Sequence, residues 1–393
     1  MFIQNGTIFT KEGVFKQGNI WIEKDKIRKI EYDTPSDTEH MQEKVDATSV
    51  NATGIDVTRI DATGMYVIPG LIDIHFHGCM GYDICDGTFT ALEAIEAYQL
   101  KNGVTSLFPA TMTLQEEELR SVFRVAGEYI ERQSTAVLGI TMEGPFLSKA
   151  KKGAQAEQHI KKPDMALFRE LQKLSGGHIC QVAVAPEEDE NFRFISEASK
   201  EVTVSVAHTV ADYDTAKQAF EQGATHVTHL LNGMPPFLHR DPGVVGAAYD
   251  NSKVCVELIC DGVHIHPAMV RAIFELFGSE RICMISDSMR ATGMPEGEYT
   301  LGGQKVWVKE NVATLEDGTI AGGICNLYQC FKKAVLEMNI PLKDAIWSCT
   351  QTPAKALGIE DKVGSIEEGK NADLLILDKN LNIKYVIKNG RQK

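Results

Sequence analysis

Four histidines and two carboxylates attract attention because each ends, or directly follows, a short run of apolar and β-branched residues. Imidazole and carboxylate groups are ligands that borderline divalent ions such as zinc favour, and a catalytic site leaves one position open for water. An ion held in this way lowers the pKa of that water to about 7. The residue types therefore predict a metal-dependent hydrolytic site. The six residues are His75, His77, Glu143, His208, His229 and Asp287.

Spacing within this set supports the same chemistry. His75 and His77 are two residues apart, and residues i and i+2 of a β-strand point to the same side, so both rings can face one ion. Asp287 has no obvious cationic partner in the sequence, which suits a proton acceptor beside the bound water. Taken singly, a strand-end histidine is usually a structural polar group, and Glu143 could cap a helix. Six such residues at equivalent positions disfavour the structural interpretation.

The strands that must position these residues alternate with longer helical stretches, a pattern typical of a parallel β/α array. Eight such units favour a (β/α)8 TIM-type barrel, an α/β fold whose active sites lie at the carboxyl ends of the strands. No G-x-G-x-x-G motif lies between a strand and a helix, which disfavours a Rossmann-type sheet. The predicted strands span residues 66–75, 105–110, 136–142, 179–185, 202–206, 226–229, 253–260 and 281–286.

Both ends of the chain have β-like patterns with turn residues between short strands. Neither end could bury its own apolar face, so we expect both to pair into one small β-sandwich that is discontinuous in sequence. The predicted domains are this sandwich, residues 1–65 and 358–393, and the barrel, residues 66–357. The polar segment 33–51 is expected to be a surface loop.

Composition restricts the partners. The 393 residues carry a formal net charge of −14, which disfavours nucleic acid and anionic membranes as partners. No signal peptide and no membrane-spanning apolar run is visible. The nine cysteines include no C-x-x-C pair and are expected to be reduced, so a cytoplasmic location is predicted. Cys79 follows His77 closely and is expected near the mouth of the cavity.

The chain resembles the amidohydrolase superfamily at the entry segment 67–78 (VIPGLIDIHFHG) and the closing segment 364–374 (GSIEEGKNADL). Within it, the chain is most similar to the N-acetylglucosamine-6-phosphate deacetylase family, on residues 142–146 (MEGPF), 228–235 (THLLNGMP), 260–264 (CDGVH) and 286–289 (SDSM). Many superfamily members carry a carboxylated lysine after strand four. Here residues 181–186 (QVAVAP) contain no lysine, and Glu143 takes its place, which disfavours a dihydroorotase or hydantoinase.

The resemblance implies hydrolysis of N-acetyl-D-glucosamine 6-phosphate to D-glucosamine 6-phosphate and acetate by a cytoplasmic homodimer. It implies that Glu143, His208 and His229 are the principal ligands of a divalent metal ion, with Asp287 as catalytic acid/base. His75 and His77 would add a second ion bridged by Glu143. One or two ions are therefore expected, zinc or iron before manganese or cobalt. The implied substrate-binding residues are Ala154, Gln155, Asn232, Gly233, Arg240 at the phosphate, His264 at the acetyl carbonyl, Ile320, Ala321 and Gly322.

Two alternatives remain open. The same reaction on N-acetylgalactosamine 6-phosphate differs by one epimeric hydroxyl, whose contacts the sequence does not reveal. A catalytically inactive barrel that serves as a scaffold would be expected to lose ligands, and here all are present. His178 and His226 lack the strand-end placement and are expected to be structural or surface residues.

Overall fold

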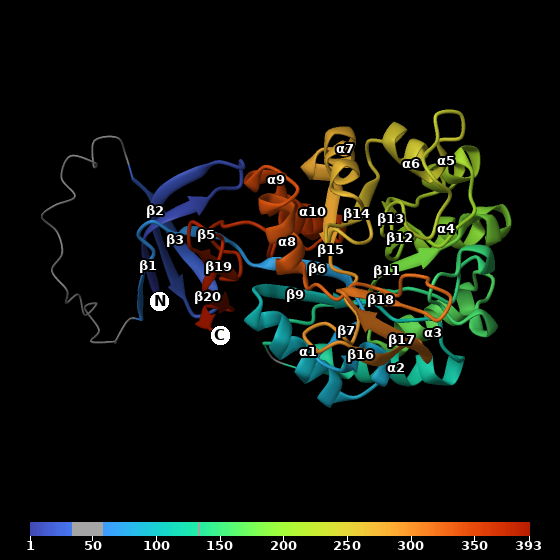
Figure 1. The fold of residues 1–393 in the computed structure, drawn as a ribbon. Coiled ribbons are helices and arrows are strands. Elements are labelled where there is room, and N and C mark those ends of the chain that lie inside the picture. Colours follow the sequence, from blue (N-terminus) through green and yellow to red (C-terminus); the bar gives the residue numbers. More distant parts are fainter. Residues whose placement is uncertain (34–57, 133) are drawn as a thin grey trace, which may run out of the picture.

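The computed structural model describes residues 1–33, 58–132 and 134–393. Figure 1 shows two parts side by side: a β-sheet built by both chain ends, and a larger part in which helices surround parallel strands. The surface loop predicted over residues 33–51 lies, beyond Asp33, outside the described residues.

Eight parallel strands form the centre of the larger part, and each predicted strand run overlaps one of them. Six form one sheet in the order β10-β11-β12-β13-β14-β15, and two others, β6 and β9, pair with each other. The strands are β6 (Leu71–Phe76), β9 (Val104–Pro109), β10 (Ile140–Met142), β11 (Ile179–Val184), β12 (Thr203–Val206), β13 (His226–Val227), β14 (Cys255–Ile259) and β15 (Ile282–Ile285).

Backbone contacts connect the two parallel sheets at both edges. An isolated parallel bridge pairs Leu107 of β9 with Val137, just before β10. At the other edge, the backbone N–H of Asp287 donates to the carbonyl oxygen of His75 at 3.0 Å. The ends of β6 and β15, and with them two of the predicted site residues, therefore lie next to each other.

Helices cover the outer side of these strands (Figure 1). Aliphatic and aromatic side chains such as Phe123, Leu171, Val206 and Val256 fill the space between, and each contributes about 1.5–3 kcal/mol by burial. None of the helices in the described residues is both long and apolar enough to cross a bilayer. The helices are α1 (Phe89–Lys101), α2 (Glu116–Ile130), α3 (Met165–Leu174), α4 (Arg193–Ala198), α5 (Tyr213–Glu221), α6 (Gly243–Asp250), α7 (Pro267–Phe277), α8 (Leu327–Leu336), α9 (Leu342–Cys349) and α10 (Gln351–Ala356).

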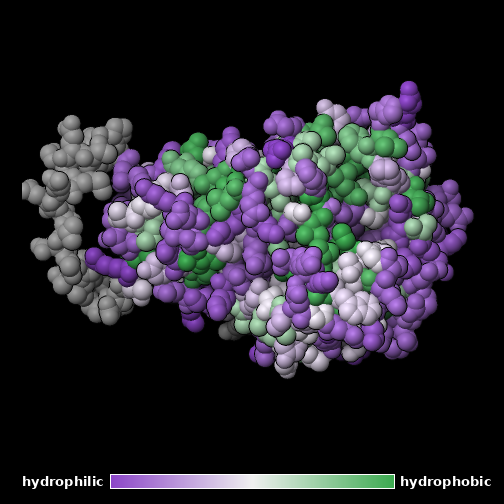
Figure 2. Space-filling model, in the orientation of Figure 1, coloured by the Kyte–Doolittle hydropathy of each residue, from purple (hydrophilic) through white to green (hydrophobic). Residues whose placement is uncertain are grey.

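Both chain ends contribute to one eight-stranded mixed sheet, ordered β21-β20-β19-β5-β1-β2-β3, with β4 paired to β1. It has a core of its own, which includes Ile8, Ile20 and Ile376. Hydrophilic side chains cover most of the face in Figure 2, with smaller apolar patches between them. The strands are β1 (Phe2–Phe9), β2 (Phe15–Glu23), β3 (Lys26–Tyr32), β4 (Arg59–Asp61), β5 (Tyr66–Pro69), β19 (Leu374–Leu377), β20 (Ile383–Lys388) and β21 (Arg391–Gln392).

The predicted strand over residues 66–75 is two strands in the structure. Its first part, β5, pairs with β1 and β19 of the terminal sheet, and only its second part, β6, lies among the parallel strands. The chain passes between the two sheets at Gly70, where a Cβ atom would lie 2.2 Å from Oγ1 of Thr105. Both parts are apolar, so hydrophobicity alone did not separate them.

A small antiparallel sheet follows β15, and the sequence analysis assigned no structure to it. Its strands are β16 (Gly297–Leu301), β17 (Gln304–Lys309) and β18 (Val312–Thr314). Its apolar side packs on Met112 and Met289, and Nε2 of Gln304 donates to the carbonyl oxygen of Ala154 at 2.5 Å. This sheet therefore lies against the loop after β10. A further short hairpin, β7 (Gly78–Cys79) with β8 (Tyr82–Asp83), follows β6.

Candidate metal centre

Glu143, which follows β10, lies at the centre of a cluster of imidazole rings. Its Oε1 atom is 3.1 Å from Nε2 of both His208 and His229 and 3.6 Å from Nε2 of His75. Its Oε2 atom is 3.5 Å from Nε2 of His77. All five side chains are buried. The structure thus brings together the five residues that were predicted as ligands.

These side chains form two groups that share Glu143. The ligand atoms of His75, His77 and Glu143 lie within 4.8 Å of one another, and so do those of Glu143, His208 and His229. We refer to them as the strand triad and the loop triad. Nε2 of His75 is buried and has no hydrogen-bond partner, which is costly for a polar atom but suits a ligand directed at an ion. The donor set of both triads therefore fits a divalent metal.

In each of the four histidine rings, the Nδ1 atom also contacts an oxygen atom. A histidine that donates from Nδ1 keeps its lone pair on Nε2, where it can bind a metal. Three of the rings face a backbone carbonyl oxygen, and the fourth, that of His75, faces a carboxylate. The contacts are His77 to Ala110 at 3.0 Å, His208 to Lys151 at 2.7 Å, His229 to Asn232 at 3.2 Å and His75 to Oε2 of Glu257 at 2.9 Å.

Several site residues have a backbone conformation that non-glycine residues rarely adopt. The φ angles of His208, His229 and Asp287 are 41°, 28° and 48°, and each residue lies just beyond the end of a parallel strand. Such conformations cost about 1–3 kcal/mol each and cluster at functional sites. Gly233 approaches His208 closely, because a Cβ atom on it would lie 3.0 Å from Nδ1 of the ring.

Asp287 faces the cluster from the end of β15. Its Oδ1 atom lies 3.3 Å from Nε2 of His77 and 3.9 Å from Nε2 of His75. Burial alone would raise the pKa of this carboxyl, but its contact with His77 and the charges of nearby imidazoles lower its pKa below the usual value. Asp287 is therefore ionised at neutral pH and can accept a proton.

A cavity of about 250 Å³ opens beside the cluster. The predicted residues that line it are His77, Glu143, Ala154, Gln155, His208, His229, Asn232, Gly233, His264, Asp287, Ile320 and Gly322. The lining residues that the sequence analysis did not select are Met112, Gly153, Leu301 and Thr319.

Two of the predicted substrate contacts do not line this cavity. Ala321 is fully buried in the apolar core beneath the small antiparallel sheet. Arg240 is exposed on the loop between β13 and α6, with its Nη1 atom 2.6 Å from Nε2 of His239. Among the described residues, no lysine or arginine lines the cavity. In this structure, therefore, Arg240 lies outside the cavity it was expected to serve.

Hydrogen bonds orient two of the lining residues, His264 and Gln155. Nδ1 of His264 lies 2.7 Å from Oδ2 of Asp261, and although burial lowers the pKa of this imidazole, that carboxylate raises it above the usual value. Gln155 donates from Nε2 to Oε2 of Glu143 at 2.7 Å and accepts from the backbone N–H of Thr113 at 2.7 Å. Gln155 thus holds the second oxygen of the shared carboxylate.

Cys79 does not lie at the cavity mouth, contrary to expectation. Its side chain is fully buried, with the sulfur 3.9 Å from the carbonyl oxygen of Ile95. Burial raises the pKa of the thiol to about 12. The hairpin β7–β8 turns the chain away directly after His77, so closeness in sequence did not place the sulfur near the site.

The sequence analysis missed Glu257 and set His226 aside. Both are fully buried, and Nε2 of His226 lies 3.3 Å from Oε1 of Glu257. A single carboxylate inside the apolar run 254–260 was the signal that could have identified Glu257. His178 is partly exposed and lies 2.6 Å from Glu131.

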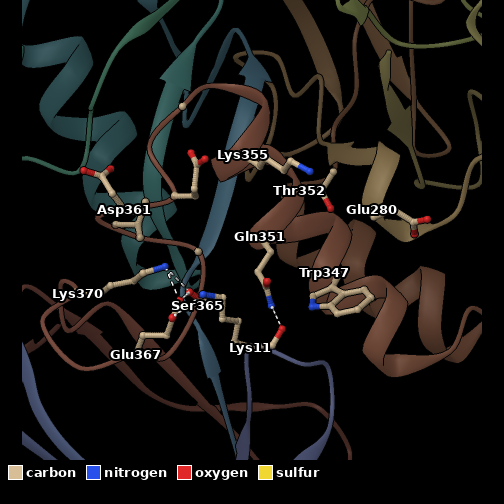
Figure 3. Close-up of a pocket in the computed structure, with 14 residues that line it drawn as sticks. Lys11, Glu280, Trp347, Gln351, Thr352, Lys355, Asp361, Ser365, Glu367 and Lys370 are labelled. Carbon is tan, nitrogen blue, oxygen red and sulfur yellow. Dashed lines mark hydrogen bonds and ion pairs between the residues drawn. The ribbon is translucent and has the colours of Figure 1, made fainter. Parts of the chain in front are cut away.

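A separate cavity of about 750 Å³ lies between the terminal sheet and α9–α10 (Figure 3). Three of its charged groups pair with one another: Nζ of Lys11 is 2.9 Å from one oxygen of Glu367, and Nζ of Lys370 is 2.7 Å from the other. Neither of the metal-type groups found in the described residues lies there. The smaller cavity beside Glu143 is therefore the candidate active site.

The profile of the Amidohydrolase family matches residues 66–393. The chain belongs to the amidohydrolase family. It is 34% identical to N-acetylglucosamine-6-phosphate deacetylase from Bacillus subtilis (strain 168), over 99% of this chain and 96% of that protein. It is 30% identical to N-acetylgalactosamine-6-phosphate deacetylase from Escherichia coli O157:H7, over 81% of this chain and 85% of that protein. Among solved structures, a mutant N-acetyl-D-glucosamine-6-phosphate deacetylase from Mycobacterium smegmatis in complex with N-acetyl-D-glucosamine-6-phosphate matches with a TM-score of 0.89 and 30% identity, covering 100% of this chain and 98% of that one.

Proposed function

We propose that this amidohydrolase removes the acetyl group from N-acetyl-D-glucosamine 6-phosphate, yielding D-glucosamine 6-phosphate and acetate in amino sugar metabolism. The observation that carries the proposal is that one cavity is lined by Asp287, His264, Glu143 and three of its four histidines, His77, His208 and His229. Similarity over the whole chain to N-acetylglucosamine-6-phosphate deacetylases supports this substrate.

The proposed fold is a closed (β/α)8 barrel with a β-sandwich made by both chain ends. The bridge from β9 towards β10 and the bond between the ends of β6 and β15 support closure of the barrel. For the sandwich, the support is a backbone hydrogen bond of 3.0 Å from Ile27 in β3 to Lys370, ahead of β19. We keep the proposed domains, residues 1–65 with 358–393 and residues 66–357, with one change. The pairing of β5 favours moving the first boundary to Gly70.

Glu143, His208 and His229 would hold one divalent ion, and Glu143 with His75 and His77 would hold a second. When bound, such an ion supplies a water of lowered pKa and an electrophile for the acetyl carbonyl. We propose zinc or iron, although this ligand set also accepts manganese or cobalt.

Asp287 is proposed to move the protons of the reaction. Its ionised carboxylate accepts a proton from the attacking water as the water oxygen bonds to the acetyl carbon. His264, oriented by Asp261, donates a hydrogen bond to the acetyl oxygen as negative charge develops there. Asp287 then delivers the proton to the sugar nitrogen, and the C–N bond breaks. One water is consumed, and the products are the amine and acetate.

The other predicted substrate contacts, of which Arg240 and Ala321 lie outside the cavity in this structure, are proposed to orient the sugar phosphate. Backbone N–H groups at Asn232 and Gly233 and the guanidinium of Arg240 would bind the phosphate, while Ala154, Gln155, Ile320, Ala321 and Gly322 would surround the sugar. Holding the phosphate fixes the acetyl group relative to Asp287, which contributes to rate through orientation.

A homodimer is proposed for the assembly, and the predicted cytoplasmic location is retained. The support for a dimer is an exposed apolar pair beside Arg240: Phe237 is 41% and Leu238 51% exposed. Such neighbouring apolar side chains are typical of interaction surfaces.

The test is amine release from four compounds, with metal content measured on the same sample. The compounds are the two phosphorylated acetylhexosamines, N-acetylglucosamine and dihydroorotate. We expect the fastest release from N-acetyl-D-glucosamine 6-phosphate. Faster release from the galactosamine epimer would favour the alternative activity, whose relative in Escherichia coli O157:H7 is also similar to this chain. A folded protein without metal and without turnover would favour the scaffold.

Asp287→Asn separates the chemistry from metal binding. We expect kcat to fall by about 10²–10⁴-fold, the usual contribution of a general acid/base, while the metal content stays unchanged. Near-normal turnover would contradict the assigned role of Asp287.

A further inference from the structure

Glu257 is a fully buried carboxylate on β14, next to the histidine cluster around Glu143. The proposed mechanism makes no use of it. Its Oε2 atom lies 2.9 Å from Nδ1 of His75 and accepts a hydrogen bond from the backbone N–H of His229 at 3.1 Å. Its Oε1 atom accepts from Nε2 of Gln181 at 2.8 Å and lies 3.3 Å from Nε2 of His226. Three of these contacts are hydrogen bonds, and the fourth, from His226, is at ion-pair distance without hydrogen-bond geometry.

A side chain that only filled space in a strand would not need these four polar contacts. A buried carboxylate is costly unless it is paired and hydrogen-bonded, and an apolar residue at this position would avoid the cost. The neighbours come from three strands or their ends, β6, β11 and β13, which fixes the position of Glu257 closely. The carboxylate can therefore restrain the ring of His75 and the backbone of His229, which it contacts.

The two contacts of Oε2 belong to different triads. His75 is a member of the strand triad, and His229 is a member of the loop triad. The other three cluster histidines have a neutral backbone carbonyl behind Nδ1. A carboxylate in that position fixes the tautomer and orientation of the ring and makes it a stronger ligand. His75 is thus the one cluster histidine with a charged partner behind it, and the same oxygen restrains the backbone that presents His229.

We infer that Glu257 is a positioning residue that directs Nε2 of His75 into the strand triad and fixes the start of the His229 loop. Gln181 and His226 hold Glu257 in place from the other side. The inference rests on the proposed metal-dependent function and deepens it, because it assigns a buried residue that determines how the second ion is bound. Glu257 does not line the cavity, so we do not assign it a contact with the substrate.

Glu257→Gln tests the inference, because the substitution keeps the shape of the side chain and removes its charge. Zinc affinity is measured by chelator competition on the metal-depleted protein, and cobalt is added to record its absorption spectrum. We expect the weaker of two bound zinc ions to lose about 10–100-fold in affinity, and the cobalt spectrum to change. We also expect kcat to fall more than KM rises, because the substrate contacts remain.

Asp189→Asn is the matched control, since it also removes a buried charge from the larger part of the chain. Asp189 accepts hydrogen bonds from the backbone N–H groups of Phe194 and Ile195, at 3.0 and 2.9 Å, and has no contact with the cluster. We expect it to lower the melting temperature with the zinc affinity and the cobalt spectrum unchanged. Glu257→Gln behaving in the same way would mean that Glu257 is only structural, and would overturn the inference.

His226→Asn provides a second test of the inference that leaves Glu257 itself intact. It removes one of the two contacts of Oε1, so we expect a smaller loss of affinity at the same ion. Where Glu257→Gln yields no folded protein, this variant decides, and an unchanged affinity and spectrum would overturn the inference. A wild-type protein that binds no metal and releases no amine would instead contradict the proposed function.

Discussion

The two triads that share Glu143 are built from different parts of the chain and are supported in different ways. In the loop triad, His208 and His229 have positive φ angles. Nδ1 of His208 contacts the carbonyl oxygen of Lys151, and Nδ1 of His229 contacts that of Asn232. In the strand triad, His75 is the last residue but one of β6, and its ring faces the buried carboxylate of Glu257. The first arrangement depends on backbone conformation and the second on a buried charge. Substitutions should therefore affect the two triads separately, except at the residue they share.

The largest effect is expected for Glu143→Gln, because this substitution weakens both triads at once. The loss of a shared carboxylate should reduce the bound metal to below one ion per chain. Loss of several kcal/mol of transition-state stabilisation lowers kcat/KM by roughly 10³-fold or more. Metal analysis and amine release on the same sample check this. Glu280→Gln, an exposed carboxylate of the other cavity, serves as the control. Two tightly bound ions in Glu143→Gln would contradict the shared role.

The next effect separates the triads. His208→Ala removes a ligand of the loop triad, the principal site, and kcat should fall by about 10²–10³-fold, as expected for losing several kcal/mol of stabilisation. His75→Ala removes a ligand of the strand triad only, and should leave one ion per chain and a kcat reduced by about 10-fold. The measurements are metal stoichiometry and kcat for both variants. Loss of both ions in His75→Ala would show that the triads are not separable.

A smaller effect tests the dependence of the loop triad on its backbone. Gly233 has a φ of 61°, and an added Cβ atom would meet Nδ1 of His208 at 3.0 Å. Gly233→Ala should therefore displace the ring and lower kcat/KM by about 10-fold, beside a loss of stability of about 1–2 kcal/mol. Gly64→Ala is the control, because Gly64 has a φ of 72° with no atom within 4 Å of an added Cβ. Equal activity of the two variants would mean that the ring of His208 has room to adjust.

The loop triad and Asp287 could be predicted from the sequence because they depend on local information. Each follows an apolar strand run, and strand ends in a parallel β/α array meet on one face. The contact between Glu257 and His75 could not be predicted in this way, because 182 residues separate them and only the arrangement of the strands in space brings them together. The division of residues 66–75 into β5 and β6 also depends on which strands lie beside them. Arg240 shows a third limit. The family resemblance implied that its guanidinium binds the phosphate, but it did not indicate that the side chain is exposed in this chain.

The smallest effect is expected at Cys79, two residues beyond the last member of the strand triad. Its thiol is fully buried and faces the carbonyl oxygen of Ile95, and burial raises its pKa to about 12, so we expect it to be neither a ligand nor a nucleophile. Cys79→Ala should cost about 1 kcal/mol of stability through the small cavity it leaves, with kcat/KM within about 2-fold of wild type. Urea unfolding, metal analysis and amine release check these expectations. Loss of an ion in this variant would show that the strand triad extends past His77, and that the hairpin β7–β8 supports the metal as well as Glu257.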